Sequence, residues 1–542
     1  MVRKYGSDSL GRGDIEADVI VLGCSLPGIV TAHKLKRKFG DTMDIVVIDL
    51  GGPARGVSKC DVVAFLDEDD RSEGSDTDTQ QPAEHSSRRY LLMYAKEFNI
   101  TIPDAILTPA AAPSLHKLFE YNNGSAVRSA NNFHDFDYLS ALERFELGQY
   151  QRQIDESMRD LFRVSKYHSP AEQKKLLSYD QTTMESHIRG ALLFPTSREI
   201  MRNMVRLVCG VAPDAVSVLF YLHQCYRNHS CREYLDGNNT RFREKLLGYC
   251  RKRLAHQLQR SVADITLSAK SIKGIRTHSR EQVILETMKG ENNYVCRLLA
   301  MALNPDQLRR IEMEPLLLSD SESRIVESLT PGRVRKFTVQ YETDFWRVQG
   351  FSGEILSVRG PIVWAMERPA LCATGRGKRY SYLVGYLRAA RGDGDKRDSR
   401  REVTEQLVRL FGERAADQLS YKESEIEDVF VPKCGHYVAL RRWCRQNSGG
   451  VEWAPLDVYQ DGDVAAALEA GHAAYLRVAS ALRPQAQSFE DVAAAEDRSD
   501  ISGNLFNRLL AKVNIVSGAS LVAYTTAAYV CVRLVKSYFA RT

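Results

Sequence analysis

Residues 17–50, ADVIVLGCSLPGIVTAHKLKRKFGDTMDIVVIDL, decide the fold class of this chain. The run ADVIVLG is rich in apolar residues and ends at a glycine, which is typical of a buried strand followed by a turn. The next segment, LPGIVTAHKLKRKFG, has the periodicity of a helix, and DIVVIDL is a second apolar run. This order predicts a βαβ unit, in which a helix connects two parallel strands.

The turn after the first strand carries a glycine motif. Gly23, Ser25 and Gly28 take the three glycine positions of the Gly-x-Gly-x-x-Gly fingerprint of dinucleotide-binding folds. Asp49 ends the second strand, where a carboxylate holds the ribose hydroxyls. Gly23 permits the tight turn, Gly28 permits close packing of helix and strand, and the hydroxyl of Ser25 is available to phosphate. The alternative is a βαβ unit that has kept its packing and lost its ligand.

The composition excludes several classes of protein. A chain of 542 residues with 44% hydrophobic and 26% charged residues is long enough for more than one globular domain. Because 74 basic residues face 69 acidic ones without a long basic run, we expect no nucleic-acid partner. Eleven cysteines without a Cys-x-x-Cys pair predict neither a metal site nor a disulfide framework, and a reducing compartment fits them. The first residues lack the apolar core of a secretory signal peptide.

Beyond the βαβ unit, the sequence resembles the flavin-containing monoamine oxidases over almost its whole length. The block of strongest similarity is GRVRKFTVQYETDFWRVQGFSGEIL at residues 332–356, which is similar to the strand, Phe-Trp pair and glycine turn of that family. Other similar segments follow in collinear order: SRRYLLMYAKEFNI, SYDQTTMESHI, APDAVSVLFYLHQC, QVILETMKGENNYVCRLLAMALNP, SYLVGYLRAARG and DVAAALEAGHAA. The resemblance implies an α/β protein, with a Rossmann-like FAD-binding domain, an interleaved α+β substrate domain and a C-terminal apolar helix.

The domain plan combines this resemblance with local composition. Residues 67–89 are acidic and nearly free of apolar residues, which predicts a disordered insert. The expected segments are the FAD-binding βαβ unit (1–66), the acidic insert (67–89), a mostly helical part of the substrate domain with a return to the FAD domain (90–260), mixed α/β segments of both domains (261–440), a last FAD-domain segment with a helix (441–484), a linker (485–514) and a transmembrane tail anchor (515–535).

The implied reaction is oxidation of a small-molecule amine to an imine, with hydride passing to FAD and dioxygen reoxidising the flavin. Lys336 falls on the family lysine that holds a water beside the reactive flavin nitrogen, so it is the best-matched catalytic position. The alternative is that Lys336 has no catalytic role and is a solvated lysine in a basic strand. A homodimer is one candidate assembly, but the sequence does not fix the oligomeric state.

Other positions depart from the family pattern. The family has an arginine- and glycine-rich run that lies against the cofactor. In this sequence only Arg55 and the glycines around it match that run. In VFVPKCGHYVALRRW, Cys434 lies one position from the family cysteine that carries the covalent flavin bond, and Tyr437 is out of register with one aromatic wall of the amine site. We therefore expect FAD to be bound without a covalent link. If Cys434 does not attach the flavin, its expected role is that of a small residue in the core.

Two further departures concern the amine and the cofactor. Asp463 stands where the family has the second tyrosine of the amine site, and residues 453–456 replace a turn whose glutamate grips the cofactor. The readings left open are an active amine oxidase with a remodelled pocket, and an inactive relative that serves binding or scaffolding at a membrane. A third hypothesis is a thioether or prenylcysteine oxidase, because the segment AHKLKRKFG also resembles that kind of flavoprotein. The block at residues 332–356 favours the amine oxidases.

The C-terminal stretch IVSGASLVAYTTAAYVCV, residues 515–532, contains no charged residue. As a helix it would span roughly 27 Å, close to the hydrocarbon thickness of a bilayer. Lys512 precedes it and Arg533 and Lys536 follow, so basic side chains can reach both interfaces. Together with the resemblance, this predicts a single-pass anchor, in the mitochondrial outer membrane with the body facing the cytosol.

Overall fold

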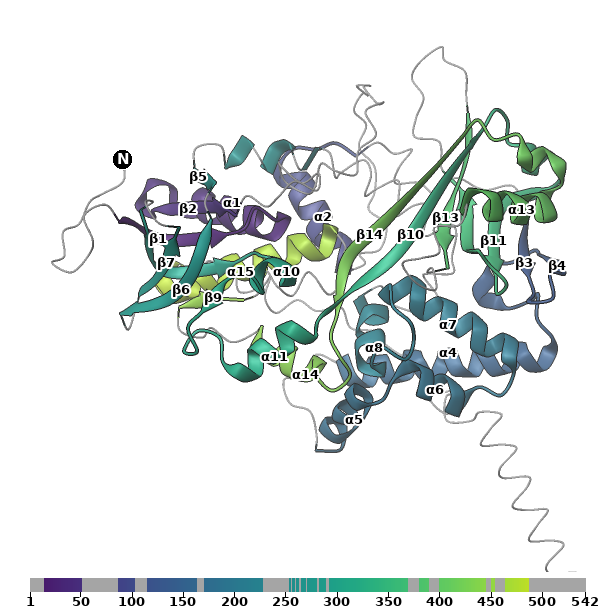
Figure 1. The fold of residues 1–542 in the computed structure, drawn as a ribbon, viewed down its shortest axis with the longest axis horizontal. Coiled ribbons are helices and arrows are strands. Elements are labelled where there is room, and N and C mark those ends of the chain that lie inside the picture. Colours follow the sequence, from purple (N-terminus) through teal and green to yellow (C-terminus); the bar gives the residue numbers. More distant parts are fainter. Residues whose placement is uncertain are drawn as a thin grey trace, which may run out of the picture. The chain divides into compact units, whose positions relative to one another are not determined.

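The computed structural model describes residues 14–50, 86–102, 115–162, 170–227, most of 253–288, 292–368, 380–388, 399–444, 450–453 and 464–486. They divide into two compact units (Figure 1). The first unit is assembled from Met1–Ala110, Arg241–Gly332 and Glu427–Ser499, and the second from the intervening segments Ala111–Thr240 and Arg333–Ile426. The chain thus passes repeatedly from one unit to the other. Two of the boundaries fall inside the long strands β10 (Thr330–Tyr341) and β14 (Ser420–Val431).

The first unit is built on a mixed sheet in the order β5-β2-β1-β8-β7-β6-β9, with β15 paired to β8. β1 lies between β2 and β8 and is parallel to both, so the predicted βαβ unit is confirmed. The strands are β1 (Ile15–Leu22), β2 (Ile45–Asp49), β5 (Thr266–Ala269), β6 (Ile272–Ser279), β7 (Gln282–Thr287), β8 (Tyr294–Met301), β9 (Glu312–Met313) and β15 (Val451–Glu452). The helices are α1 (Leu26–Phe39), α2 (Ser86–Glu97), α10 (Pro305–Leu308), α11 (Asp320–Ser328), α14 (Tyr437–Trp443) and α15 (Val464–Leu482).

Helix α15 packs closely on α1 in this unit. Gly471 leaves so little space that a Cβ there would lie 2.6 Å from the carbonyl oxygen of Pro27 and 2.7 Å from Val30 Cβ. The hydroxyl of Thr31 donates to the carbonyls of Pro27 and Gly471, at 2.8 and 3.1 Å. A helix near the end of the described chain therefore closes over the first helix.

Helix α2 is tied to α1 through Glu97. The side chain of Glu97 is 8% exposed, and its carboxylate contacts His33 Nε2 at 2.8 Å and Lys34 Nζ at 2.5 Å and also pairs with Arg37. Burial alone would raise the pKa of Glu97, but the hydrogen bonds with His33 and Lys34 lower it to about 2. Helix α2 begins at Ser86, so the last four residues of the segment predicted to be disordered are helical, while residues 51–85 lie outside the described part. The helix starts there because RRYLLMYAKE supplies the apolar periodicity that the acidic residues lack.

The second unit contains a sheet in the order β14-β10-β13-β12-β11-β3-β4 and a group of helices. Besides β10 and β14, its strands are β3 (His116–Glu120), β4 (Ala126–Ser129), β11 (Phe351–Ser357), β12 (Ile362–Glu367) and β13 (Ser381–Leu387). Its helices are α4 (Ala141–Phe162), α5 (Pro170–Gln181), α6 (Met184–Ala191), α7 (Pro195–Cys209), α8 (Val218–Arg227), α12 (Phe345–Val348) and α13 (Ser399–Phe411).

One face of this second sheet is covered by α13. Phe337 and Val339 of β10 pack with Val403 and Leu407 of that helix in one buried cluster. Helix α13 is also linked to β3 through Glu120. The fully buried carboxylate of Glu120 accepts hydrogen bonds from Ser357, Gln406 and Arg409, at 2.8, 2.6 and 2.9 Å. Because residues alternate along a strand, the neighbours of Phe337 and Val339 on β10 point to the opposite face.

Candidate functional site

The carboxyl ends of β1, β2, β8 and β15 share one edge of the first sheet, because all four strands run parallel. From β1 the chain continues on one side to β2 and later returns on the other side through β8, so the edge beyond β1 is a topological switch point. Ligands of open α/β sheets bind at such points. Gly23, Asp49 and Ala302 lie at or directly after these strand ends.

Gly23 and Gly28 are constrained by close backbone contacts at this edge. Gly23 has φ +108°, and a Cβ on it would lie 2.4 Å from the carbonyl oxygen of Ala302. A Cβ on Gly28 would lie 2.6 Å from the carbonyl oxygen of Gly23 and 2.7 Å from Ala302 Cβ. These are the two glycine roles of a dinucleotide-binding turn, the tight turn and the close packing of helix against strand.

Ser25 is the N-cap residue of α1 and connects this turn to β8. Its hydroxyl donates to the carbonyl oxygen of Ala302 at 2.7 Å. Since phosphate oxygens are acceptors and the hydroxyl proton is already used, a phosphate contact of Ser25 has to come from its backbone amide. Pro27, the second residue of α1, has no N–H, so the amides of Leu26 and Gly28 are the donors of the first helical turn.

Asp49 ends β2, beside the turn, and its side chain is half-buried. Gly23, Ser25, Gly28 and Asp49 therefore lie at the same edge of the sheet. Arg55 lies outside the described residues. The turn, the helix amides and the carboxylate have the chemistry needed for the adenosine diphosphate half of FAD.

The segment around β15 differs from the family pattern. Trp453 follows β15, is fully buried and contacts the Trp443 ring with 4.7 Å between centroids. The preceding Glu452 is also fully buried, and Arg477 of α15 donates to it at 3.0 Å. A carboxylate thus lies one position before the replaced turn, but it pairs with a basic side chain of the protein. Residues 454–463, including Asp463, lie outside the described part.

Cys434 and Tyr437 lie in and after the turn between β14 and α14. Gly435 in this turn has φ +86°, and Cys434 is half-buried and is not part of a disulfide bond with a described cysteine. His436 precedes α14 and its Nδ1 lies 2.8 Å from the hydroxyl of Ser328. Tyr437 is the first residue of α14, and only 2% of it is exposed.

Lys336 belongs to the second unit, on the face of β10 opposite the cluster under α13. It is opposite Tyr386 of β13, and Tyr386 is opposite Trp364 of β12. The rings of Trp364 and Tyr386 stack, with 5.9 Å between centroids and 26° between planes. Trp364 is 2% exposed, and its indole N–H has no hydrogen-bond partner among the described residues.

The aromatic pair beside Lys336 is a candidate part of the site that the sequence interpretation missed. The signal was present in SYLVGYL and IVWAME, whose alternation places Tyr386 and Trp364 on one face of each strand. What was missing was the pairing register, which brings both aromatic rings into the same row as Lys336.

Residues 125–451, more than half of the chain, match the sequence profile of the family described as flavin containing amine oxidoreductase. The chain belongs to this family. Its amine oxidoreductase relatives include a Mycobacterium tuberculosis protein named flavin-containing monoamine oxidase AofH, which is 23% identical over 58% of this chain and 69% of that protein. A Dictyostelium discoideum protein named flavin-containing monoamine oxidase A is 22% identical over 47% of this chain and 56% of that protein.

Solved structures of amine oxidases share the fold. A putrescine oxidase bound to putrescine is 12% identical and has a TM-score of 0.64, with 86% of this chain and all of that chain covered. Cyclohexylamine oxidase from Brevibacterium oxydans is 17% identical with a TM-score of 0.61, covering 86% of this chain and 99% of that chain. Membership of the amine oxidoreductase family makes FAD the cofactor, and the glycine turn and Asp49 fit its dinucleotide part.

Proposed function

We propose that the protein oxidises an amine, with FAD as hydride acceptor and dioxygen as the final oxidant. The observation that carries the proposal is the family match across both units, which includes the strand with Lys336 and its row of aromatic side chains. When bound, the flavin supplies the redox chemistry, and the residues of the chain position the amine and control its proton.

The row of Lys336, Tyr386 and Trp364 suggests how an amine would be held. The half-buried ring of Tyr386, which stacks on the buried ring of Trp364, offers an apolar surface to an alkyl or aryl group. The indole N–H of Trp364, which has no partner in the described part of the chain, can donate to a polar atom of the substrate. Lys336 is half-buried and, by resemblance, holds a water next to the flavin. A substrate with an apolar body and a single amino group fits these residues.

Anaerobic mixing of the purified, flavin-loaded protein with a series of amines tests the proposal. We expect loss of the oxidised-flavin absorbance with at least one amine and production of hydrogen peroxide when air is admitted. Matched alcohols of the same carbon skeleton are the control. A protein that keeps stoichiometric FAD and is reduced by no amine in the series would contradict the proposal.

A second candidate function is that of a non-catalytic relative that binds or organises partners. Specific observations that favour it are the burial of Trp453 where the family has a cofactor-binding turn, and the commitment of Glu452 to Arg477. Each charge-assisted hydrogen bond that the cofactor lacks costs about 1.5–3 kcal/mol, which weakens FAD binding roughly ten- to a hundredfold. Purification without flavin, together with failure to bind added FAD, would favour this candidate.

We expect FAD to be held without a covalent bond. Cys434 is out of register with the family cysteine, and the turn that carries it includes Gly435 at a positive φ. Precipitation of the flavin-loaded protein with acid should leave the yellow colour in the supernatant. Colour that stays in the pellet of the natural chain, and moves to the supernatant in Cys434→Ser, would contradict this expectation.

We propose that residues 515–535 anchor the protein in a membrane, with the mitochondrial outer membrane as the expected location. In the described part of the chain no helix is long and apolar enough to cross a bilayer, and residues 515–535 lie outside that part. The support is the uncharged stretch flanked by basic residues.

Expression of residues 1–505 beside the full chain tests the anchor. The full chain should stay in the membrane pellet under alkaline carbonate, and the shorter chain should be released. Recovery of the full chain in the soluble fraction without detergent would refute the anchor, as would equally firm membrane binding by the shorter chain.

A further inference from the structure

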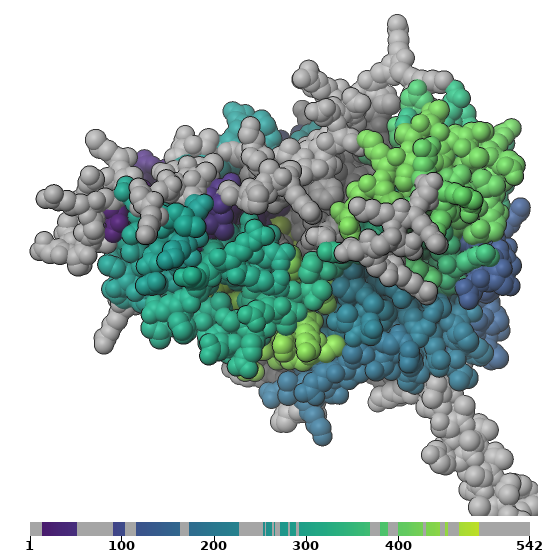
Figure 2. All heavy atoms as spheres, viewed as in Figure 1, coloured from purple at the N-terminus to yellow at the C-terminus, as the bar shows by residue number. Residues whose placement is uncertain are grey.

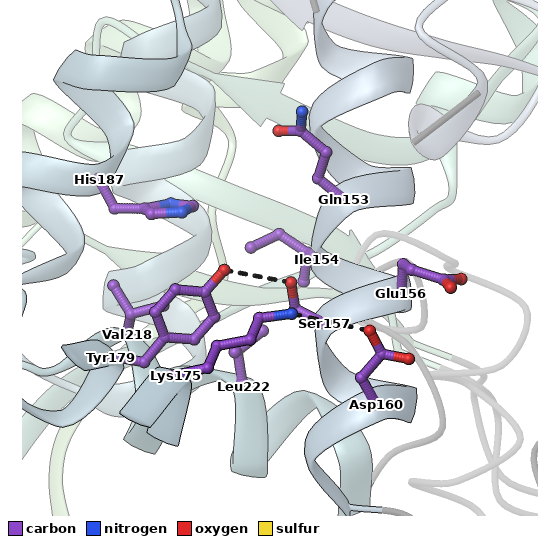
Figure 3. Close-up of a pocket in the computed structure, with 10 residues that line it drawn as sticks. All are labelled: Gln153, Ile154, Glu156, Ser157, Asp160, Lys175, Tyr179, His187, Val218 and Leu222. Carbon is purple, nitrogen blue, oxygen red and sulfur yellow. Dashed lines mark hydrogen bonds and ion pairs between the residues drawn. The ribbon is translucent and has the colours of Figure 1, made fainter. Parts of the chain in front are cut away.

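A cavity of about 500 Å³ lies among helices α4, α5, α6 and α8 of the second unit (Figure 3). The residues of these helices, coloured blue, form part of the molecular surface in the space-filling view (Figure 2). The volume is in the range typical of sites for small organic ligands. Ile154, Val218 and Leu222 give the cavity an apolar part. None of its lining residues belongs to the sites assigned above to FAD or the amine.

His187 presents a ring nitrogen to this cavity. Its Nδ1 lies 2.8 Å from the hydroxyl of Tyr150, which is buried. Burial lowers the pKa of His187, so the imidazole is neutral near pH 7. In Figure 3 the ring points toward the space between α4 and α5. No described residue forms a hydrogen bond with Nε2, so this nitrogen is available to a ligand.

Lys175 supplies a positive charge with spare hydrogen-bonding capacity. Its Nζ is 3.7 Å from Asp160, which is too long for a hydrogen bond, and 5.5 Å from the centre of the Tyr179 ring. An ammonium group has three donors, and no described residue accepts a hydrogen bond from this one. The hydroxyls of Tyr179 and Ser157 are 3.3 Å apart beside it (Figure 3). One of these two hydroxyls donates to the other, so Lys175 and the remaining hydroxyl proton are the hydrogen-bond donors of this group.

The cavity lining also holds two acidic residues, Glu156 and Asp160. Glu156 pairs with Arg159 at 3.5 Å, and Asp160 has its long ion pair with Lys175. Both Asp160 and Lys175 are more than a third exposed, so solvent screens their attraction. An anionic oxygen at hydrogen-bond distance would therefore satisfy Lys175 better than Asp160 does.

We propose that this cavity binds a small carboxylate with an apolar body, at a site distinct from the amine-oxidising site. The carboxylate lies between Lys175, Tyr179 and Ser157, and the body packs on the apolar part formed by Ile154, Val218 and Leu222. Nε2 of His187 contacts a polar atom of the same ligand. The inference goes beyond the proposed function, because it holds whether or not the protein oxidises amines.

Calorimetric titration of the full-length protein with phenylacetate tests this site, with phenylacetamide as the neutral analogue of the same shape. Phenylacetate should bind with a dissociation constant of about 1 mM or tighter, and the amide about tenfold more weakly. Lys175→Met should weaken phenylacetate binding about ten- to a hundredfold, because it removes a charge-assisted contact. Tyr179→Phe removes a single hydroxyl and should weaken binding less. Lys174→Met, at the exposed neighbour on α5, is the matched control and should leave binding unchanged.

Three outcomes would overturn the proposal. One is the absence of heat at about 10 mM phenylacetate with a protein whose circular dichroism is that of the folded chain. Another is equal binding of the amide, which would exclude carboxylate recognition. The third is undiminished binding by Lys175→Met accompanied by a shift of the flavin absorbance, which would place the ligand beside the flavin. In contrast, a flavin-free preparation that still binds phenylacetate in a Lys175-dependent way would support the site even if amine oxidation fails.

Discussion

Replacement of Lys336 by methionine is expected to slow flavin reduction by about a hundredfold or more, since a positioned proton-transfer group contributes roughly 10²–10⁴ to a rate. Methionine keeps much of the length of the side chain and removes the ammonium group. Lys336 points to the face of the sheet that also carries Tyr386 of β13, away from the buried cluster under α13. We therefore expect β10 to fold normally in this variant. Rapid-mixing measurements of the reduction rate, with flavin content measured in parallel, check this expectation.

The matched control for Lys336 is Lys422→Met, at an exposed position of β14 in the same sheet. This variant should reduce its flavin at the natural rate. An unchanged rate in Lys336→Met would remove Lys336 from the chemistry. Loss of flavin in Lys336→Met, with the remaining flavin reacting normally, would instead show that the residue serves folding.

Gly28→Ala is expected to abolish stable FAD binding and to destabilise the first unit. The added Cβ would lie 2.6 Å from the carbonyl oxygen of Gly23 and 2.7 Å from Ala302 Cβ, so the turn and the helix have to separate. Overpacking of this kind costs about 1–3 kcal/mol, and the displaced amides would no longer converge on the pyrophosphate. Flavin content after gel filtration and the melting temperature are the measurements.

The same substitution at Gly190 is the control for Gly28. Gly190 lies in α6 with no other atom within 4 Å of an added Cβ, so Gly190→Ala should melt at or slightly above the natural temperature. If Gly28→Ala retained full flavin and an unchanged melting temperature, the close packing at the turn would not be needed for the cofactor.

The first βαβ unit could be predicted because its signals are local. The apolar strands, the glycine turn and the helix all lie within residues 15–49, so periodicity and motif spacing were sufficient. The position of Lys336 on a strand was also predictable. Tyr386 and Trp364 were not, because their place beside Lys336 depends on how β10, β13 and β12 pair, which no local pattern fixes.

The environments of Glu452 and Tyr437 were missed for a related reason. Glu452 is bound by Arg477, which is 25 residues later, and Tyr437, which the sequence placed out of register with an aromatic wall of the amine site, is buried at the start of a helix. Burial and long-range pairing arise from tertiary packing. The hydrogen bond of the Ser25 hydroxyl could not be predicted for the same reason, because its acceptor, the carbonyl of Ala302, is 277 residues away in the sequence.

The return of the chain to its first unit has a consequence during protein synthesis. Val21 in β1 pairs with Ala300 in β8, and α1 is covered by α15, which ends at Leu482. At about 5–20 residues per second, a ribosome needs roughly 25 to 90 seconds to make the residues between β1 and the end of α15. Throughout that time the face of α1 that packs on α15 lacks its native cover, so the nascent chain is expected to depend on chaperones. Premature termination before α15 is expected to yield aggregation-prone chains.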